Sequence, residues 1–275
     1  MGQAVILMFI AMSMIPAGDL AGKLLTGGHG VAPAFVGWSR FALGTLMILP
    51  FLGRIPWRLL RDWRIWLRAM FLAGGILSIQ TALRTAPMAD VFAAFFIGPM
   101  VSFALSVLFL REPVGPLRVA LMGLGFAGVL LVARPGFGGA PGIGWALLAG
   151  LFYGAYLTAS RWLAHLGTAR GLSFTQLLLG AVLLAPVGLP QTPPLTAPVI
   201  VLTLASAGFS MLGNMLLIVA YARAPASRMA PLVYFQLIAA TGLGWIAFGD
   251  LPDALTWAGL ALVIGAGLIS AMLRR

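Results

Sequence analysis

Runs of apolar residues follow one another along nearly the whole chain of 275 residues and are separated by short polar links. Each run has about 20 residues, enough at ~1.5 Å per residue in a helix to cross ~30 Å of hydrocarbon. Hydrophobic residues make up 61% of the chain and charged residues only 8%, a composition that excludes a soluble domain. We therefore predict an all-α membrane protein.

Ten of these runs are predicted to be transmembrane helices, and they leave little sequence for anything else. They cover residues 4–25, 33–53, 65–84, 88–110, 115–134, 142–164, 172–189, 197–221, 229–249 and 254–273. The first run begins without a basic segment and is too long for the core of a signal peptide, so we expect it to be a retained helix.

The two halves of the chain resemble each other. At an offset of 138 residues the matches are Ala82 with Ala220, Ala86-Pro87 with Ala224-Pro225, and Glu112 with Asp250; at 136 they are Gly44 with Gly180 and Pro50 with Pro186. We predict two five-helix repeats, residues 1–137 and 138–275. Because five crossings are an odd number, the second repeat is expected to be inverted in the membrane, as in many transporters.

The charges in the links predict the orientation. With a cytoplasmic amino terminus, thirteen basic residues fall on the inner side, whereas Lys23, Arg84 and Arg134 fall on the outer side and Arg40 lies inside a helix. This bias predicts that both termini are cytoplasmic. Because the basic residues sit in these links, we expect no nucleic-acid partner. The chain has no cysteine, and we expect no cofactor and no metal site.

The longest inner link, residues 54–64, is rich in arginine and contains Trp57 and Trp63. Such a segment is suited to lying on an anionic cytoplasmic leaflet. Its simpler interpretation is an anchor that sets the orientation of the neighbouring helices.

Charged groups inside the apolar runs need compensation, since a charge at the bilayer centre costs at least ~2.5 kcal/mol. Asp19 and Arg40 are both predicted to lie ~10 Å below the outer boundary, with Lys23 one turn above Asp19. One interpretation is an ionic cluster that binds a zwitterion or takes a coupling proton at Asp19. The other is an ion pair that fastens the first two helices.

A polar stripe is predicted along the third and eighth helices. Its members on the third are Ser78, Gln80, Thr81 and Arg84, and on the eighth Ser206, Ser210 and Asn214. Single hydroxyls can bond back to their own helix, which favours a structural role for them. Because the amides of Asn214, Gln80 and Gln236 cannot easily do so, we predict that they line a substrate cavity.

Aromatic residues supply the expected walls of this cavity. The candidates are Trp38, Phe92, Phe95, Phe96, Tyr153, Tyr156 and Tyr234, of which the three tyrosines are the strongest because a buried hydroxyl needs a partner. Aromatic walls with a few polar groups could hold amino acids or flat organic cations.

Prolines and small residues suggest where helices bend and where they meet. Pro16, Pro99 and Pro231 are predicted to interrupt the first, fourth and ninth helices, as hinges or as static kinks. Pairs of small residues four apart, Gly123 with Ala127 and Ala261 with Gly265, are expected to permit close helix contact. That contact could be internal or could join a homodimer.

The ends of the fourth and ninth helices carry a family resemblance. They read Leu110-Arg111-Glu112-Pro113 and Phe248-Gly249-Asp250-Leu251-Pro252, and each is followed by a glycine-rich helix (Gly123, Gly125, Gly128; Gly259, Gly265, Gly267). The chain resembles the drug/metabolite transporter superfamily of the EamA type, and within it the YddG-type amino-acid exporters. The resemblance implies alternating access around a central cavity, a bacterial inner membrane and a small organic cargo.

We therefore predict a secondary transporter that exports amino acids or related metabolites. No nucleotide-binding loop is present, so the sequence gives no support to ATP-driven pumping by this chain alone. A flippase for lipid-linked cargo is the first alternative. An intramembrane enzyme is disfavoured because clustered carboxylates are missing and the two histidines, His29 and His165, lie on opposite sides.

Overall fold

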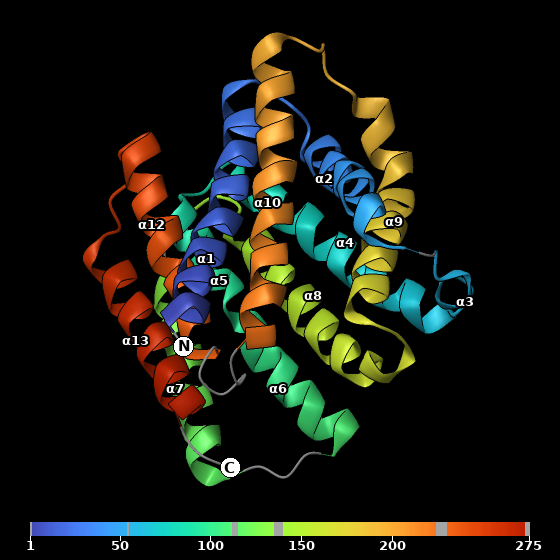
Figure 1. The fold of residues 1–275 in the computed structure, drawn as a ribbon. Helices are drawn as coiled ribbons and strands as arrows, with labels where there is room; N and C mark the ends of the chain where they lie inside the picture. The colour runs from blue at the N-terminus through green and yellow to red at the C-terminus, as the bar shows by residue number, and fades with distance from the viewer. Residues whose placement is uncertain (1, 54, 112–114, 135–139, 224–229, 273–275) are drawn as a thin grey trace.

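A computed structural model describes residues 2–53, 55–111, 115–134, 140–223 and 230–272 (Figure 1). The described residues fold into helices and contain no strand, which confirms the all-α prediction. Seven helices are long and apolar enough to cross a membrane. Three shorter apolar helices cover the fifth, ninth and tenth predicted spans, and the count of ten crossings stays a prediction.

The helices of the first half follow the predicted runs closely. They are α1 (Gly2–Lys23) with the π-helical turn η1 (Leu24–Gly28), α2 (Pro33–Ile48), η2 (Leu49–Phe51), α3 (Trp57–Leu60), α4 (Trp63–Leu83), α5 (Met88–Phe95), α6 (Ile97–Leu110) and α7 (Pro116–Ala133).

Among the residues that the structure describes, the second half repeats the pattern without a counterpart of α3. Its helices are α8 (Ile143–Trp162), η3 (Ala164–Leu166), α9 (Ala169–Gly188), η4 (Leu189–Gln191), α10 (Ala197–Arg223), η5 (Ala230–Tyr234), α12 (Phe235–Phe248) and α13 (Ala254–Met272).

Helix ends follow from local sequence. Pro33 starts α2, where its missing N–H is not needed, and the Asp62 side chain accepts the Arg64 backbone N–H at the start of α4. Arg111 ends α6 and Gly249 ends α12, both with positive φ. These two residues are 138 apart, so the halves terminate the matching helix in the same left-handed conformation.

The predicted fourth helix is broken at Phe96, between α5 and α6. Pro99 explains the break, because it has no N–H to donate to the carbonyl of Phe95. The matching position, Tyr234, ends the 3₁₀ turn η5 at the start of α12, and the Phe96 and Tyr234 ring centroids are 5.4 Å apart. Pro16, in contrast, lies inside the continuous helix α1.

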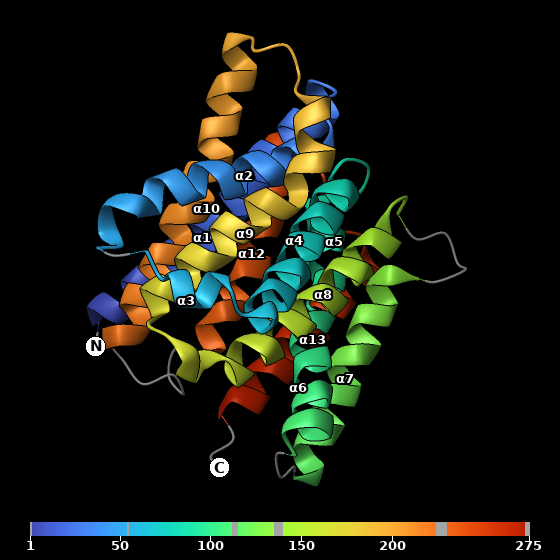
Figure 2. The same cartoon turned by 90° about the vertical axis from the view of Figure 1, so that its right-hand side faces the viewer.

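Helices from the two halves are interleaved. The N-terminal helix α1 packs along α10, α2 packs on α9, and α4 packs on α8 and α9. Figures 1 and 2 show α4 and α8 side by side and α7 beside α13. The most extensive helix packing therefore joins one half to the other.

Helix α8 lies very close to the broken segment because it carries two glycines. A Cβ on Gly150 would lie 2.7 Å from the carbonyl oxygen of Phe95, and one on Gly154 would lie 2.6 Å from that of Gly98. The two glycines let α8 approach the backbone at the break.

Alanine at Gly150 should therefore destabilise the protein by about 1–3 kcal/mol, the usual cost of overpacking. Thermal unfolding of the purified protein in detergent measures the effect. Gly208→Ala, in the interior of α10 where nothing lies within 4 Å, is the control and should be neutral or stabilising by at most about 1 kcal/mol. Equal stability of the two variants would contradict this packing.

The crossing of α7 and α13 uses other glycines than predicted. A Cβ on Gly128 would lie 2.8 Å from the Gly259 carbonyl oxygen, and one on Gly259 would lie 2.6 Å from that of Gly128. Gly123 and Gly265, the predicted contact residues, have nothing within 4 Å. The close contact is therefore internal and reciprocal, but it lies on a different helix face.

Candidate functional site

A buried polar cluster joins four helices and is called here the Asp19 network: Asp19, Arg40, Gln80 and Ser206. The Arg40 Nη1 donates to Asp19 Oδ1 at 2.6 Å, and Gln80 Nε2 donates to the same oxygen at 3.0 Å. Arg40 Nε donates to Ser206 Oγ at 2.7 Å, and Ser206 donates to the carbonyl of Gly18 at 2.9 Å. Asp19 is 4% exposed and Arg40 is 7% exposed. The predicted meeting of Asp19 and Arg40 is confirmed.

Two glycines of α1 let this network form. A Cβ on Gly18 would lie 3.1 Å from Arg40 Nη2, and one on Gly22 would collide with Gln80 Oε1. Arg40 Nη2 and Gln80 Oε1 are buried and have no hydrogen-bond partner among the described residues. Because unpaired buried polar atoms are costly, these two atoms reduce the net stabilisation that the network provides in this arrangement.

A second cluster, the Arg68 network, contains Arg68, Tyr156, Ser160 and Gln176. Arg68 donates to Ser160 Oγ at 2.8 Å, to Gln176 Oε1 at 2.7 Å, to Tyr156 Oη at 3.2 Å and to the Leu172 carbonyl at 3.1 Å. Arg68 is 5% exposed and makes no ion pair with any described residue. The positive charge of Arg68 is therefore surrounded by neutral oxygens. A guanidinium without a carboxylate partner can donate hydrogen bonds to an electronegative group of a cargo.

The two networks occupy related places in the two repeats. Ser206 matches Arg68 at an offset of 138, and Gln176 matches Arg40 at 136. Both networks also share α4, which carries Arg68 and Gln80 twelve residues apart, ~18 Å along the helix. They therefore lie at two depths of one bundle.

Three aromatic side chains, here called the aromatic ladder, lead to the Arg68 network: Phe95, Tyr153 and Tyr156. The Phe95 and Tyr153 ring centroids are 4.8 Å apart, and Tyr153 stacks on Tyr156 at 6.0 Å. The Arg68 guanidinium lies over the Tyr156 ring at 4.9 Å. The ladder ends on a cation, and its rings are only partly buried.

Lys23 does not join Asp19 and Arg40 as predicted. Its Nζ donates to the Ala86 carbonyl at 2.5 Å, lies 4.0 Å from Asp250 Oδ2 and lies over the Phe248 ring at 4.9 Å. The ends of α1 and α12 meet in the tertiary structure, and this places Asp250 within reach of Lys23. Glu112, the repeat mate of Asp250, lies outside the described residues.

A hollow of about 250 Å³ lies beside this pair, where α5 begins and α12 ends. Asp253 accepts from Arg134 at 2.5 and 2.6 Å and from the Thr256 backbone N–H at 2.8 Å. The hydrogen bonds from Arg134 and then from Thr256 lower the pKa of Asp253 to about 2. Asp90 lines the same hollow and accepts from Thr256 Oγ1 at 3.1 Å.

Several predicted site residues lie apart from both networks. Asn214 is exposed and donates to the Ser210 carbonyl of its own helix at 2.8 Å, so the expectation that its amide needs another helix is wrong. Thr81 bonds back to Leu77, and Arg84 is exposed at the end of α4. Trp38 packs on Phe35 and Gly188.

The remaining predicted residues are buried or half-buried within the helices. Ser78 is buried on α4, and Gln236 is half-buried in the first turn of α12. Phe96 and Tyr234 contact each other at the helix breaks, and Tyr234 also packs onto Gly267. The rings of Phe96 and Tyr234 therefore have a packing role, whereas the aromatic ladder ends at Tyr156 beside the Arg68 guanidinium.

Sequence reasoning missed the role of Arg68, which was counted with the charges of an inner link. One signal was present in the sequence. Ile65, Arg68, Ala69 and Ala73 follow the spacing of one helix face, and all four are buried. An arginine on an apolar helix face needs acceptors from its neighbours, and Tyr156, Ser160 and Gln176 supply them.

Comparison with known proteins assigns the family. The family model for the EamA-like transporter family matches residues 2–134 and again residues 140–272. The chain belongs to the EamA-like transporter family. It is therefore a membrane transporter with several apolar helices, and the broader part of the predicted resemblance is confirmed.

Two curated relatives are named riboflavin transporters. The one from Rhizobium johnstonii is 30% identical over 83% of this chain and 78% of its own, and the one from Brucella anthropi is 26% identical over 87% and 88%. A third, named an S-adenosylmethionine uptake transporter, from Rickettsia bellii, is 25% identical over 85% and 81%. These names give no support to amino-acid export.

The fold also matches an experimental structure. A solved crystal structure aligns with a TM-score of 0.61 and 23% identity, covering 97% of this transporter and 95% of that chain. This likeness concerns the fold alone.

Proposed function

We propose that this transporter carries a flat heteroaromatic metabolite of the riboflavin kind across the bacterial inner membrane, without ATP. The aromatic ladder ending at Arg68 is the observation that carries the proposal. Planar rings stack on aromatic side chains, and the ring carbonyls of a flavin accept hydrogen bonds from a guanidinium. The relatives named for riboflavin and S-adenosylmethionine support it, because both molecules contain a fused nitrogen heterocycle joined to a hydroxylated sugar-derived unit, which is an open ribityl chain in riboflavin and a ribose ring in S-adenosylmethionine.

The proposed mechanism is alternating access between two inverted five-helix repeats, residues 1–137 and 138–275, with both termini in the cytoplasm. The Asp19 and Arg68 networks lie at two depths on α4, and each ties helices of one half to helices of the other. Opening one network while the other stays closed would expose the cargo to one side at a time. Two further features remain predictions: that Asp19 takes a coupling proton, and that the protein forms a homodimer.

Purified protein in liposomes tests the cargo. We expect labelled riboflavin to exchange across the membrane and to be displaced by excess unlabelled riboflavin, with or without an imposed pH gradient. Labelled S-adenosylmethionine and a panel of amino acids are measured in parallel. Movement of amino acids without movement of riboflavin would overturn the proposed cargo in favour of the exporter predicted from sequence. Faster riboflavin exchange when one compartment is made more acidic would show that a proton is coupled to transport.

A further inference from the structure

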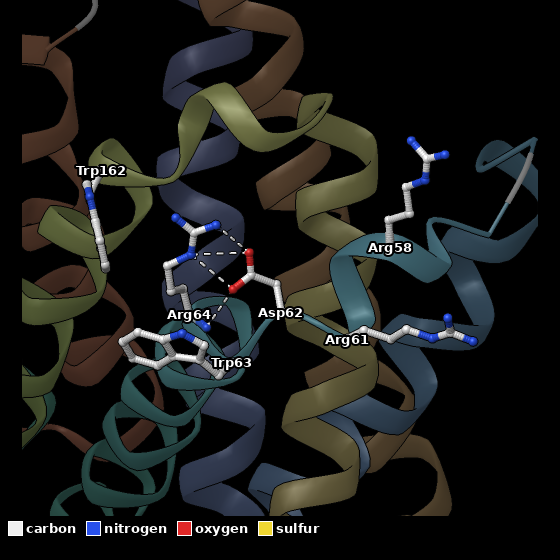
Figure 3. A pocket seen from close by; sticks show the side chains of 6 residues that line it. All are labelled: Arg58, Arg61, Asp62, Trp63, Arg64 and Trp162. Atoms are coloured by element: carbon white, nitrogen blue, oxygen red, sulfur yellow. Dashed lines mark hydrogen bonds and ion pairs between the residues drawn. The ribbon is translucent and has the colours of Figure 1, made fainter.

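An open hollow of about 630 Å³ lies where the link after α2 meets the end of α8 (Figure 3). Six residues line it and define the arginine-tryptophan pocket: Arg58, Arg61, Asp62, Trp63, Arg64 and Trp162. None of them belongs to the Asp19 network, the Arg68 network or the aromatic ladder. The pocket therefore shares no residue with the proposed transport route.

The short helix α3 is fixed to the bundle by two leucines. Leu59 and Leu60 pack against the buried cluster that contains Ile65, Leu163 and Leu172. A Cβ on Gly167 would lie 2.8 Å from the Leu59 side chain, which shows how closely α3 approaches the link between α8 and α9. This anchoring places Arg58 and Arg61 on the exposed side of α3, as Figure 3 shows.

The pocket has an excess of positive charge. Asp62 is committed to Arg64, whose Nη2 lies 2.7 Å from Asp62 Oδ2 and whose Nε lies 3.0 Å from Oδ1. This hydrogen bonding lowers the pKa of Asp62 below its usual value. Arg58 and Arg61 are exposed and make no ion pair with any residue that the structure describes. Two guanidinium groups are thus left for an anion.

Two indoles of the same link and Trp162 of α8 are exposed as well. Trp57 is 64% exposed, Trp63 67% and Trp162 42%. The Arg64 guanidinium lies over the Trp162 ring at 5.9 Å, so this indole also borders the charge. Tryptophan favours the headgroup layer of a membrane, where its ring is shielded from water and its N–H can still be solvated.

The pocket lies at the boundary of the apolar spans. Trp63 is the first residue of the candidate span Trp63–Leu83, and Trp162 is the last residue of Ile143–Trp162. A helix boundary of this kind coincides with the phosphate layer of the bilayer. The ligand chemistry at that depth is a phosphodiester attached to acyl chains.

We propose that the arginine-tryptophan pocket binds the headgroup of an anionic phospholipid such as phosphatidylglycerol. Arg58 and Arg61 donate to the lipid phosphate, and Trp63 and Trp162 contact the adjoining glycerol and upper acyl chains. A free phosphate would leave the indoles exposed to water, which favours a lipid as the source of the anion. The proposal does not depend on which cargo the transporter carries.

Native mass spectrometry of the full-length protein, titrated with phosphatidylglycerol or phosphatidylcholine in detergent, tests the site. Phosphatidylglycerol should bind more tightly, and Arg58→Gln and Arg61→Gln should each weaken its binding roughly fivefold, because one basic group near an anionic surface contributes about that much. Added salt should weaken phosphatidylglycerol binding by the wild-type protein and should reduce the difference in affinity between the wild-type protein and the two variants.

Arg111→Gln is the matched control, since Arg111 is an exposed arginine at the end of α6 that does not line the pocket. It should leave phosphatidylglycerol binding unchanged, and all three variants should keep the unfolding temperature of the normal protein. Equal weakening by Arg111→Gln would overturn the site in favour of a diffuse charge effect. Competition by inorganic phosphate as effective as that by the lipid would overturn the assignment to a lipid.

Discussion

Replacing Asp19 with alanine is expected to lower the free energy of unfolding by about 3–5 kcal/mol, because Arg40 would keep its charge inside the bundle without a counterion. Both side chains are almost fully buried, and Arg40 Nη1 lies 2.6 Å from Asp19 Oδ1. Arg40→Ala should have a similar effect, since the carboxylate would then keep the hydrogen bond from Gln80 but lose its counterion. Unfolding in a mild detergent, followed by tryptophan fluorescence, measures both variants.

Two controls separate the ion pair from other effects at the same place. The double variant Asp19→Leu, Arg40→Met removes both charges and should recover a large part of the loss, because a buried pair is often replaceable by apolar side chains. Arg64→Ala breaks a pair that is much less buried, and should change stability by no more than about 1 kcal/mol. A loss for Asp19→Ala no larger than that for Arg64→Ala would show that the buried pair does not fasten the helices.

Removing the middle ring of the aromatic ladder should impair transport strongly. Tyr153→Leu is expected to raise the KM for riboflavin by about fivefold or more, because stacking on one aromatic side chain contributes about 1–3 kcal/mol and about 1.4 kcal/mol is a factor of ten. Tyr153 lies between Phe95 and Tyr156, with centroids at 4.8 and 6.0 Å. Initial rates of labelled riboflavin exchange in liposomes give the KM.

The neighbouring residue provides a control of the same chemistry. Phe152 packs on Gly74 of α4 and is not part of the ladder, so Phe152→Leu should leave the KM within about twofold while it loses a similar area of aromatic surface. Tyr153→Phe keeps the ring and should transport nearly normally. An unchanged KM for Tyr153→Leu would show that the aromatic ladder does not bind the cargo. It would not affect the assignment to the transporter family.

Hydropathy and charge made much of the architecture predictable. A run of apolar residues forms a helix in the bilayer because its own backbone groups must pair with one another, so helix positions follow from local sequence. Asp19 and Arg40 were also predictable as a pair, because both lie at the same depth on consecutive helices. The sequence match at an offset of 138 residues predicted which segments correspond. Arg111 and Gly249, which are 138 residues apart, both have positive φ angles, as this correspondence leads one to expect.

The break at Phe96 was half predictable. Pro99 indicated an interruption of the helix. The helix breaks three residues before Pro99, at Phe96, because the carbonyl that loses its hydrogen bond is that of Phe95. The approach of Gly150 to the freed carbonyl of Phe95 depends on α8, which comes from the other half of the chain. Such a contact cannot be read from either segment alone.

The sequence by itself determined that this protein is a helical membrane transporter, where most of its helices lie and that Asp19 is placed to meet Arg40. Only the tertiary structure decided that Arg68 is buried among hydrogen-bond acceptors, that Lys23 pairs with Asp250, and that Asn214 bonds to its own helix. The physical reason is that hydropathy fixes the depth of a residue along its helix. The partner that its side chain finds depends on the rotation of that helix and on which neighbour packs against it.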